Sequence, residues 1–131
     1  MILPRAAEEA ILAHAHSASP QECCGLLLGR DDRVFRAVAA RNAATDPIRR
    51  FLVEPEDYFE AIRQARREAL DVIGVYHSHP RSAAIPSATD RAEGFENFVF
   101  LIVGLGHEPP EITAWSWAAG NFDPLPLVRC P

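Results

Sequence analysis

Residues 74–80 read GVYHSHP, six residues follow, and residues 87–90 read SATD. The first segment ends an apolar run that is rich in β-branched and aromatic residues, which predicts a strand. Side chains two positions apart on a strand point to the same face, so His77 and His79 can bind one ion while Ser78 points away. The segment therefore predicts a strand that presents two imidazoles at its carboxyl end.

The second segment predicts the start of a helix. Ser87 has the position of an N-cap, and Asp90 falls in the first turn, close to where the chain leaves the two histidines. Imidazole and carboxylate are ligands of catalytic zinc, which typically has three protein ligands and an open position for water. His77, His79 and Asp90 are therefore candidate zinc ligands. Taken alone, Ser-x-x-Asp is more typical of a capped helix, and the two interpretations are compatible because a cap fixes where the aspartate points.

The spacing of these segments resembles the signature of the JAMM/MPN metalloproteases. In that family an upstream glutamate is followed by His-x-His, seven residues and Ser-x-x-Asp, and this chain matches the pattern at every position. The glutamate usually stands just before a strand of the type Cys-Gly-Leu-Leu-Leu-Gly. Residues 21–29 read QECCGLLLG, so the resemblance maps the glutamate to Glu22 and covers nearly the whole chain.

The resemblance implies both a fold and a set of roles. The fold would be α/β: a single JAMM/MPN domain over residues 1–131, similar to cytidine deaminases, with a mixed β-sheet flanked by helices. Zn²⁺ would be held by the two histidines and Asp90, and Glu22 would move a proton from water to the leaving amine. Ser87 would donate a hydrogen bond to the developing oxyanion, a role that could compete with capping. Without the resemblance, Glu22 would be interpreted as a solvated loop acid.

The resemblance also implies a class of substrate. Family members cleave the amide or isopeptide bond after the C-terminal glycines of ubiquitin or ubiquitin-like proteins. The eukaryotic deubiquitinases carry insertions that bind ubiquitin, for which 131 residues leave little room. The small bacterial members instead remove an amino acid or short peptide beyond the diglycine of a ubiquitin-like sulfur-carrier protein. We therefore expect such a carrier as the substrate, with its extended tail lying beside the active site as an added strand.

Three alternatives differ in the features they require. A zinc deaminase uses His-x-Glu with Pro-Cys-x-x-Cys, but His79 stands at the glutamate position and the chain has no Cys-x-x-Cys. A non-catalytic scaffold of the same family would have lost ligands that this chain retains. The same peptidase chemistry on another target, such as a phage-tail or cell-wall protein, fits every residue quoted above.

Length and composition narrow the class of protein. A chain of 131 residues suits one domain, and the net charge of −5 disfavours nucleic acid as a partner. No apolar run approaches the ~18 residues of a membrane span, and the N-terminus does not resemble a signal peptide, so we expect a cytoplasmic protein that does not bind membranes. A homodimer is compatible with these features, which do not define an oligomeric state. All 13 basic residues are arginine.

The cysteines and the remaining histidines fit structural roles better than catalytic ones. Cys23 and Cys24 lie in the apolar strand and are expected to be buried small hydrophobic residues rather than ligands or nucleophiles. The three cysteines do not suggest a disulfide framework. His14 and His16 form a second His-x-His, but in a predicted helix, where residues two apart do not share a face. His107 is expected to be a solvated loop residue.

The remaining pattern predicts helices alternating with strands. The second helix should bury a stripe made of Tyr58, Ile62, Ala65, Ala69 and Leu70. The predicted helices span residues 4–19, 54 to about 70, and 87 to about 96, and the predicted strands span 23–28, 33–41, 51–53, 71–79, 98–103 and 111–117, with a final edge strand within 121–131.

Overall fold

The computed structural model describes residues 1–92 and 98–131, so the end of the predicted third helix, at 93–96, lies outside the described residues. None of the described helices is long and apolar enough to cross a lipid bilayer. The helices are α1 (Arg5–Ala18), α2 (Pro55–Arg67) and α3 (Ala88–Ala92), and the strands are β1 (Ile2–Pro4), β2 (Cys24–Arg30), β3 (Arg33–Ala40), β4 (Asp71–His79), β5 (Val99–Gly104), β6 (Glu111–Ala118), β7 (Asn121–Leu125) and β8 (Val128–Cys130).

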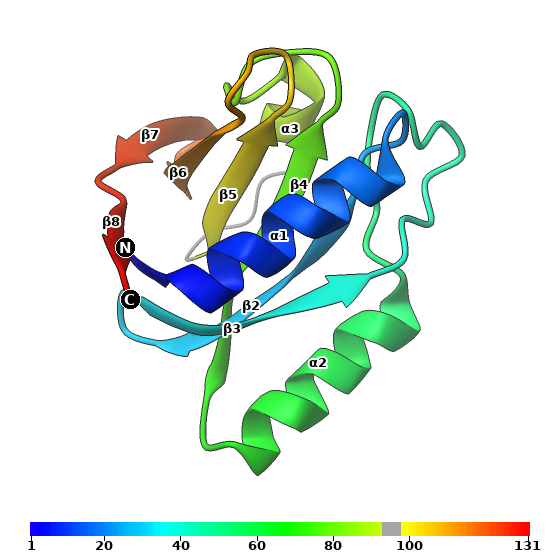
Figure 1. The fold of residues 1–131 in the computed structure, drawn as a ribbon. Helices are drawn as coiled ribbons and strands as arrows, with labels where there is room; N and C mark the ends of the chain where they lie inside the picture. Colours follow the sequence, from blue (N-terminus) through cyan, green and yellow to red (C-terminus); the bar gives the residue numbers. More distant parts are fainter. Residues whose placement is uncertain (93–97) are drawn as a thin grey trace.

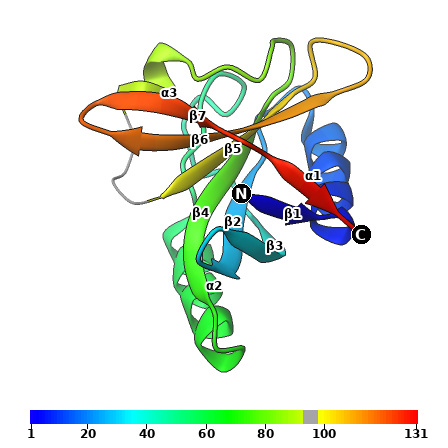
Figure 2. The same cartoon turned by 90° about the vertical axis from the view of Figure 1, so that its left-hand side faces the viewer.

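All the described strands belong to one mixed sheet. Its order is β7-β6-β5-β4-β2-β3-β1-β8, with β4 parallel to β5 and β1 parallel to both β3 and β8. The strands β7 and β8 stand at opposite ends of this order, yet only residues 126 and 127 separate them. The sheet must therefore curl strongly, and Figures 1 and 2 show the C-terminal ribbon bridging its two edges.

The two long helices cover opposite faces of β2. Its sequence is continuously apolar, as expected for a strand buried on both sides. Leu27 packs in a cluster with Ile11 of α1, whereas Leu26 packs in a second cluster with Ala61 and Ala65 of α2. Burying each such leucine contributes about 1.5–3 kcal/mol. This arrangement confirms the predicted α/β fold with a mixed sheet flanked by helices (Figure 1).

The structure gives β4 the predicted bounds, residues 71–79, and β2 and β3 pair as an antiparallel hairpin. The C-terminal segment, predicted as one edge strand, instead forms two short strands on opposite edges. Such short strands carry too few residues to show a period. The short strand predicted at 51–53 is also wrong, because Val53 forms only an isolated bridge with Asn42.

The predicted stripe of α2 is right in part: Ala65 is buried, Tyr58 and Ile62 are half-buried, and Leu70 is buried but lies after the last residue of the helix. Ala69 lies beyond the end of the helix, where its φ of 56° places it in the left-handed region. Its side chain is consequently exposed, and Ala61 is buried in the stripe instead. The helix ends at Arg67, about three residues earlier than the pattern indicated.

The second His-x-His motif does not form a metal site. Nδ1 of His14 lies 2.7 Å from the hydroxyl oxygen of Tyr76, and the two rings meet edge to face. His16 is exposed and its Nδ1 lies 2.9 Å from the carbonyl oxygen of Leu12 on its own helix. This outcome confirms the prediction of packing and solvated histidines. The His14–Tyr76 contact ties α1 to β4, the strand that carries the other histidine pair.

This contact predicts a pH dependence of stability. Burial lowers the pKa of His14, so the unfolded chain binds that proton more readily than the folded one. The stabilisation from neutral His14 is therefore complete above about pH 6.5 and is lost as the pH falls below it. Urea unfolding on either side of that pH should show less acid destabilisation in His14→Gln than in wild type. Equal acid sensitivity of the two proteins would contradict this assignment.

Candidate metal centre and active-site cleft

The end of β4 places two histidines on one face and a serine on the other. His77 and His79 are both buried. Ser78 faces away from them, as the strand period predicts, and its Oγ accepts a hydrogen bond of 2.8 Å from the backbone N–H of Cys23. Its own N–H donates to the Cys23 carbonyl at 3.2 Å. Ser78 therefore fixes the end of β4 to the chain just before β2 and takes no part in the cluster of imidazoles.

Three polar side chains converge at the carboxyl end of β4. The Nε2 atoms of His77 and His79 are 3.2 Å apart, and Oδ2 of Asp90 lies 3.2 Å from the first and 3.1 Å from the second. The candidate ligand atoms of these residues all lie within 4.8 Å of one another, and all three residues are buried. The structure thus brings together the three ligands predicted from sequence, two from β4 and one from α3.

The electrostatics of this cluster suit a cation. Burial acts to raise the pKa of Asp90, but its contacts with His77 and His79 outweigh burial and hold that pKa well below its usual range. Burial also acts to lower the pKa of His79, but hydrogen bonds with Asp90 and the Ala83 carbonyl prevail and raise it. An ionised carboxylate in a buried site requires a positive partner. Because two imidazole nitrogens and one carboxylate oxygen converge there, the residues fit a divalent metal ion.

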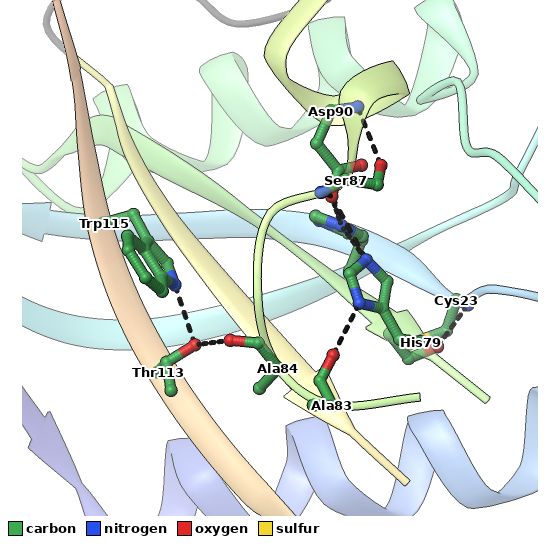
Figure 3. A network of polar contacts seen from close by, with 10 residues as sticks. Cys23, His79, Ala83, Ala84, Ser87, Asp90, Thr113 and Trp115 are labelled. Carbon is green, nitrogen blue, oxygen red and sulfur yellow. Dashed lines mark hydrogen bonds and ion pairs between the residues drawn. The ribbon is translucent and has the colours of Figure 1, made fainter. Parts of the chain in front are cut away.

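Neighbouring groups hold the candidate ligands in position. Nδ1 of His79 lies 2.9 Å from the carbonyl oxygen of Ala83, which favours a proton on Nδ1 and leaves Nε2 to face the cluster. Phe51 stacks on the His77 ring with centroids 4.4 Å apart and planes inclined by 20°. The Ser87 N–H donates to Oδ2 of Asp90 at 2.9 Å. Each candidate ligand therefore has a contact that restricts its orientation, and Figure 3 shows that of His79 with Ala83.

Ser87 combines capping with a second available role. The backbone N–H of Asp90 donates to Oγ of Ser87 at 3.0 Å, which is the predicted helix cap. This bond uses a lone pair of the hydroxyl oxygen and not its hydrogen. A serine hydroxyl has one donor hydrogen and two acceptor lone pairs, so Ser87 can cap α3 and still donate a hydrogen bond into the cleft. The two roles, which the sequence suggested could compete, use different parts of the same group.

Side chains of β6 support the loop between the histidines and Ser87. The N–H of Ala84 donates to Oε1 of Glu111 at 3.1 Å, and its carbonyl accepts from Oγ1 of Thr113 at 2.6 Å. Nε1 of Trp115 in turn donates to Oγ1 of Thr113 at 2.8 Å (Figure 3). A Cβ atom on Gly104 would lie only 2.5 Å from the Ala84 nitrogen. The loop is therefore held closely against β5 and β6. The sequence showed the alternation of β6 but not which loop it would meet.

Glu22 is buried and faces the same cleft as the candidate metal site. A cleft of about 520 Å³ is lined by Glu22, His79 and Ser87 among others. The negative charge of Glu22 contributes to raising the pKa of His79, which reflects their proximity. The backbone N–H of Glu22 donates to the carbonyl of Pro47 at 2.8 Å. The sequence had placed this carboxylate beside an apolar strand, and the structure shows the desolvation that such a position implies.

Asn42 connects Glu22 to the loop that follows β3. Its Nδ2 donates to the carbonyls of Glu22 at 3.0 Å and Arg50 at 3.1 Å. Its Oδ1 accepts from the N–H groups of Ala44 at 3.0 Å and Leu52 at 3.1 Å. The amide is therefore bonded through both its nitrogen and its oxygen. No short motif marks such a residue, because its partners are backbone groups of a loop that has no periodic pattern.

The Asn42→Asp substitution tests whether this connection positions Glu22. It keeps the shape but replaces the donor with an oxygen that repels the two carbonyls. We expect the kcat of the reaction in this cleft to fall about tenfold, and stability to fall by about 1–3 kcal/mol. Asn121→Asp on β7 adds the same charge at an exposed position and serves as the control. Kinetics and urea unfolding would measure both effects, and a wild-type kcat in Asn42→Asp would argue against positioning.

The remaining candidates have the structural roles predicted for them. Cys23 and Cys24 are both buried, and burial raises the pKa of Cys24 to about 12, so it is a neutral thiol at physiological pH. The metal-binding cluster found among the described residues contains neither cysteine. His107 is exposed in the loop between β5 and β6.

The convergent ligands and the buried carboxylate beside them are those of a metal-dependent hydrolase. Residues 4–118 match the family model described as prokaryotic homologs of the JAB domain, and the chain belongs to this family. It is accordingly an enzyme of the JAMM/MPN metallopeptidase class, as the sequence predicted.

Curated relatives carry related names. A protein of Pyrococcus furiosus named desampylase is 36% identical over 123 residues, which cover 92% of this chain and 84% of that protein. A probable TtuB-protein conjugate cleaving protease of Thermus thermophilus is 32% identical over 104 residues, covering 79% of this chain and 70% of that protein. A CysO-cysteine peptidase of Mycobacterium tuberculosis is 36% identical over 84 residues, covering 62% of this chain and 56% of that protein.

Solved structures share the fold. The solution structure of protein DSY2949 from Desulfitobacterium hafniense has a TM-score of 0.90 and 29% identity, with 99% of this chain and 93% of that chain covered. A structure described as "JAMM: A Metalloprotease-like Zinc Site in the Proteasome and Signalosome" has a TM-score of 0.63 and 21% identity, with 99% and 96% covered. The curled mixed sheet is therefore the JAMM/MPN fold.

Proposed function

We propose that residues 1–131 form a zinc-dependent peptidase domain. It hydrolyses the amide bond after the C-terminal diglycine of a ubiquitin-like sulfur-carrier protein. The observation that carries this proposal is the convergence of two imidazole nitrogens and one carboxylate oxygen at a buried point of the cleft that also contains Glu22 and Ser87. In this proposal His77, His79 and Asp90 are the metal ligands.

The donor set supports zinc as the metal. Catalytic zinc in peptidases is commonly held by two histidines and one carboxylate, with a fourth position left for water. The related structure at 21% identity is itself described as having a metalloprotease-like zinc site. A zinc ion bound here would lower the pKa of a water molecule toward neutrality and polarise the substrate carbonyl.

Two side chains of the cleft supply the remaining chemistry. Glu22 accepts a proton from the attacking water, whose oxygen bonds to the carbonyl carbon. The hydroxyl of Ser87 donates to the oxygen of that carbonyl as negative charge develops on it. Glu22 then delivers the proton to the amide nitrogen, the carbon–nitrogen bond breaks, and the amine leaves. The products are a carboxylate on the carrier and a free amine, so one water is consumed for each bond.

The shape of the cleft supports a diglycine before the scissile bond. Every candidate ligand is buried, so the substrate backbone must approach closely. Glycine, which has no side chain, allows such an approach. The names of two relatives also support a protein substrate: a probable TtuB-protein conjugate cleaving protease and a CysO-cysteine peptidase.

Intact-mass analysis of a carrier tests this function. A sulfur carrier from the same genome, with residues beyond its diglycine, is incubated with zinc-loaded protein. We expect the carrier to lose the mass of those residues, and the loss to require Glu22. An unchanged carrier despite bound zinc would overturn the carrier assignment and favour another protein target, such as a phage-tail or cell-wall protein. An unchanged carrier and no bound zinc would overturn the proposed function altogether.

A further inference from the structure

The active-site cleft carries positive charge although the chain as a whole is acidic. Arg49, from the loop that follows β3, and Arg81, from the loop that follows β4, both line it. Within the described part of the chain, Glu22 is the only carboxylate among the lining residues. The chain has a net charge of −5, so this local excess of arginine is not a property of the whole surface. Charge of this sign favours an anionic group in the substrate.

The two arginines differ in their partners. Arg49 lies 3.7 Å from a carboxylate oxygen of Asp46, and its side chain is 84% exposed. Arg81 has no carboxylate within 4.0 Å among residues 1–92 and 98–131. A guanidinium is always charged and its planar set of donors matches a carboxylate with two parallel hydrogen bonds. Arg81 is therefore the cleft residue best suited to bind a carboxylate from the substrate.

The position of Arg81 limits how far that carboxylate lies from the scissile bond. Its Cα is two residues from that of His79, a candidate metal ligand, and so at most about 7 Å away along the chain. In a substrate with a one-residue extension, the terminal carboxylate carbon lies about 2.5 Å from the scissile nitrogen. Each further residue moves the carboxylate by up to about 3.3–3.6 Å. This spacing along the chain is compatible with a contact between Arg81 and the carboxylate of a one- or two-residue extension.

The walls of the cleft accommodate such a tail. Ile48 and Ile85 both line the cleft, on the two loops that carry the arginines, and both are large apolar side chains with about half or more of their surface exposed. Exposed apolar side chains at the mouth of a cleft mark a binding surface. A tail lying between them would bring its terminal carboxylate toward Arg81, next to the candidate metal site.

We propose that Arg81 is a specificity-determining residue that binds the free α-carboxylate of the leaving group. This inference rests on the proposed peptidase function. It predicts that the chain prefers a carrier with a one- or two-residue C-terminal extension. A carrier joined to the side chain of a lysine has no α-carboxylate at this distance from the scissile bond. Hydrolysis of a carrier with a one-residue extension releases an amino acid, and Arg81 binds the carboxylate of that amino acid until it dissociates.

Three matched substrates test this proposal. All three contain the same carrier ending in diglycine. The first is extended by one residue with a free carboxylate, and the second by the same residue as a carboxamide. In the third, the diglycine is joined to a lysine side chain. Wild type should cleave the free acid with a kcat/KM at least about tenfold above that of the carboxamide, because a charge-assisted hydrogen bond is lost in the latter. Arg81→Gln should abolish this preference, mainly by raising KM for the free acid.

Two further variants complete the design. Arg81→Lys should retain part of the preference, since it keeps the charge but not the planar pair of donors. Arg66→Gln removes a positive charge from an exposed position of α2 and should behave as wild type. Equal cleavage of acid and carboxamide by wild type, faster cleavage of the lysine-linked carrier, or an unchanged preference in Arg81→Gln would overturn this proposal while leaving the peptidase in place. If none of the three substrates is cleaved, the proposed function itself fails.

Discussion

Glu22→Gln is expected to lower kcat for carrier cleavage by about 10³-fold, within the range found for general acid–base residues. Glutamine keeps the shape of the side chain but can neither take a proton from water nor return it to the leaving amine. The fold should be preserved because the substitution is nearly isosteric. Single-turnover kinetics with zinc-loaded protein would measure the chemical step without contributions from product release.

A matched control separates this effect from a general loss of negative charge. Glu9→Gln makes the same change at an exposed position of α1 and should leave kcat unaltered. Metal content should be the same in wild type and in both variants, because Glu22 is not among the candidate ligands. A Glu22→Gln variant that retains more than about a tenth of wild-type kcat would contradict the assignment of Glu22 as the base.

Removal of the metal is expected to abolish activity and to lower thermal stability. Without a cation, the buried Asp90 carboxylate is stabilised by its contacts with His77 and His79 and by the Ser87 N–H. A ligand that binds only the folded state adds stability in proportion to the logarithm of its concentration over its Kd. Dialysis against a chelator should therefore lower both turnover and Tm, and added Zn²⁺ should restore both.

His77→Ala serves as the control for this prediction. The variant lacks one candidate ligand. Chelator and added zinc should therefore change its residual activity and its Tm much less than they change those of wild type. Full activity of the wild-type protein after exhaustive chelation would show that the buried cluster does not take part in catalysis through a metal.

The strand, its histidines and the helix cap could be predicted because they depend on local rules. Alternation along β4 put His77 and His79 on one face, and the capping preference of Ser87 put Asp90 in the first turn of α3. The apolar sequence of residues 23–28 likewise predicted the strand that became β2. These features follow from periods of two or of 3.6 residues, which a single sequence displays directly.

The residues that hold the site in position could not be predicted. Their partners lie far away in the sequence, on segments that have no periodic pattern. Thr113 contacts Ala84 across 29 positions, and Asn42 contacts Glu22 across 20 positions. Arg81 lies two residues after His79 in the sequence, yet its place in the cleft depends on how the loop after β4 folds against β5 and β6. Pairing of β1 with β8 brings the two ends of the chain together, which no local pattern specifies.

The most direct test of the account is the zinc content of the purified protein, measured by elemental mass spectrometry against protein concentration. We predict about one zinc per chain in wild type. We also predict a zinc content near zero in Asp90→Ala, together with loss of peptidase activity. A wild-type protein that cleaves its substrate without any bound metal, or an Asp90→Ala variant that retains zinc and activity, would contradict the claim that the buried His–His–Asp cluster is a catalytic metal centre.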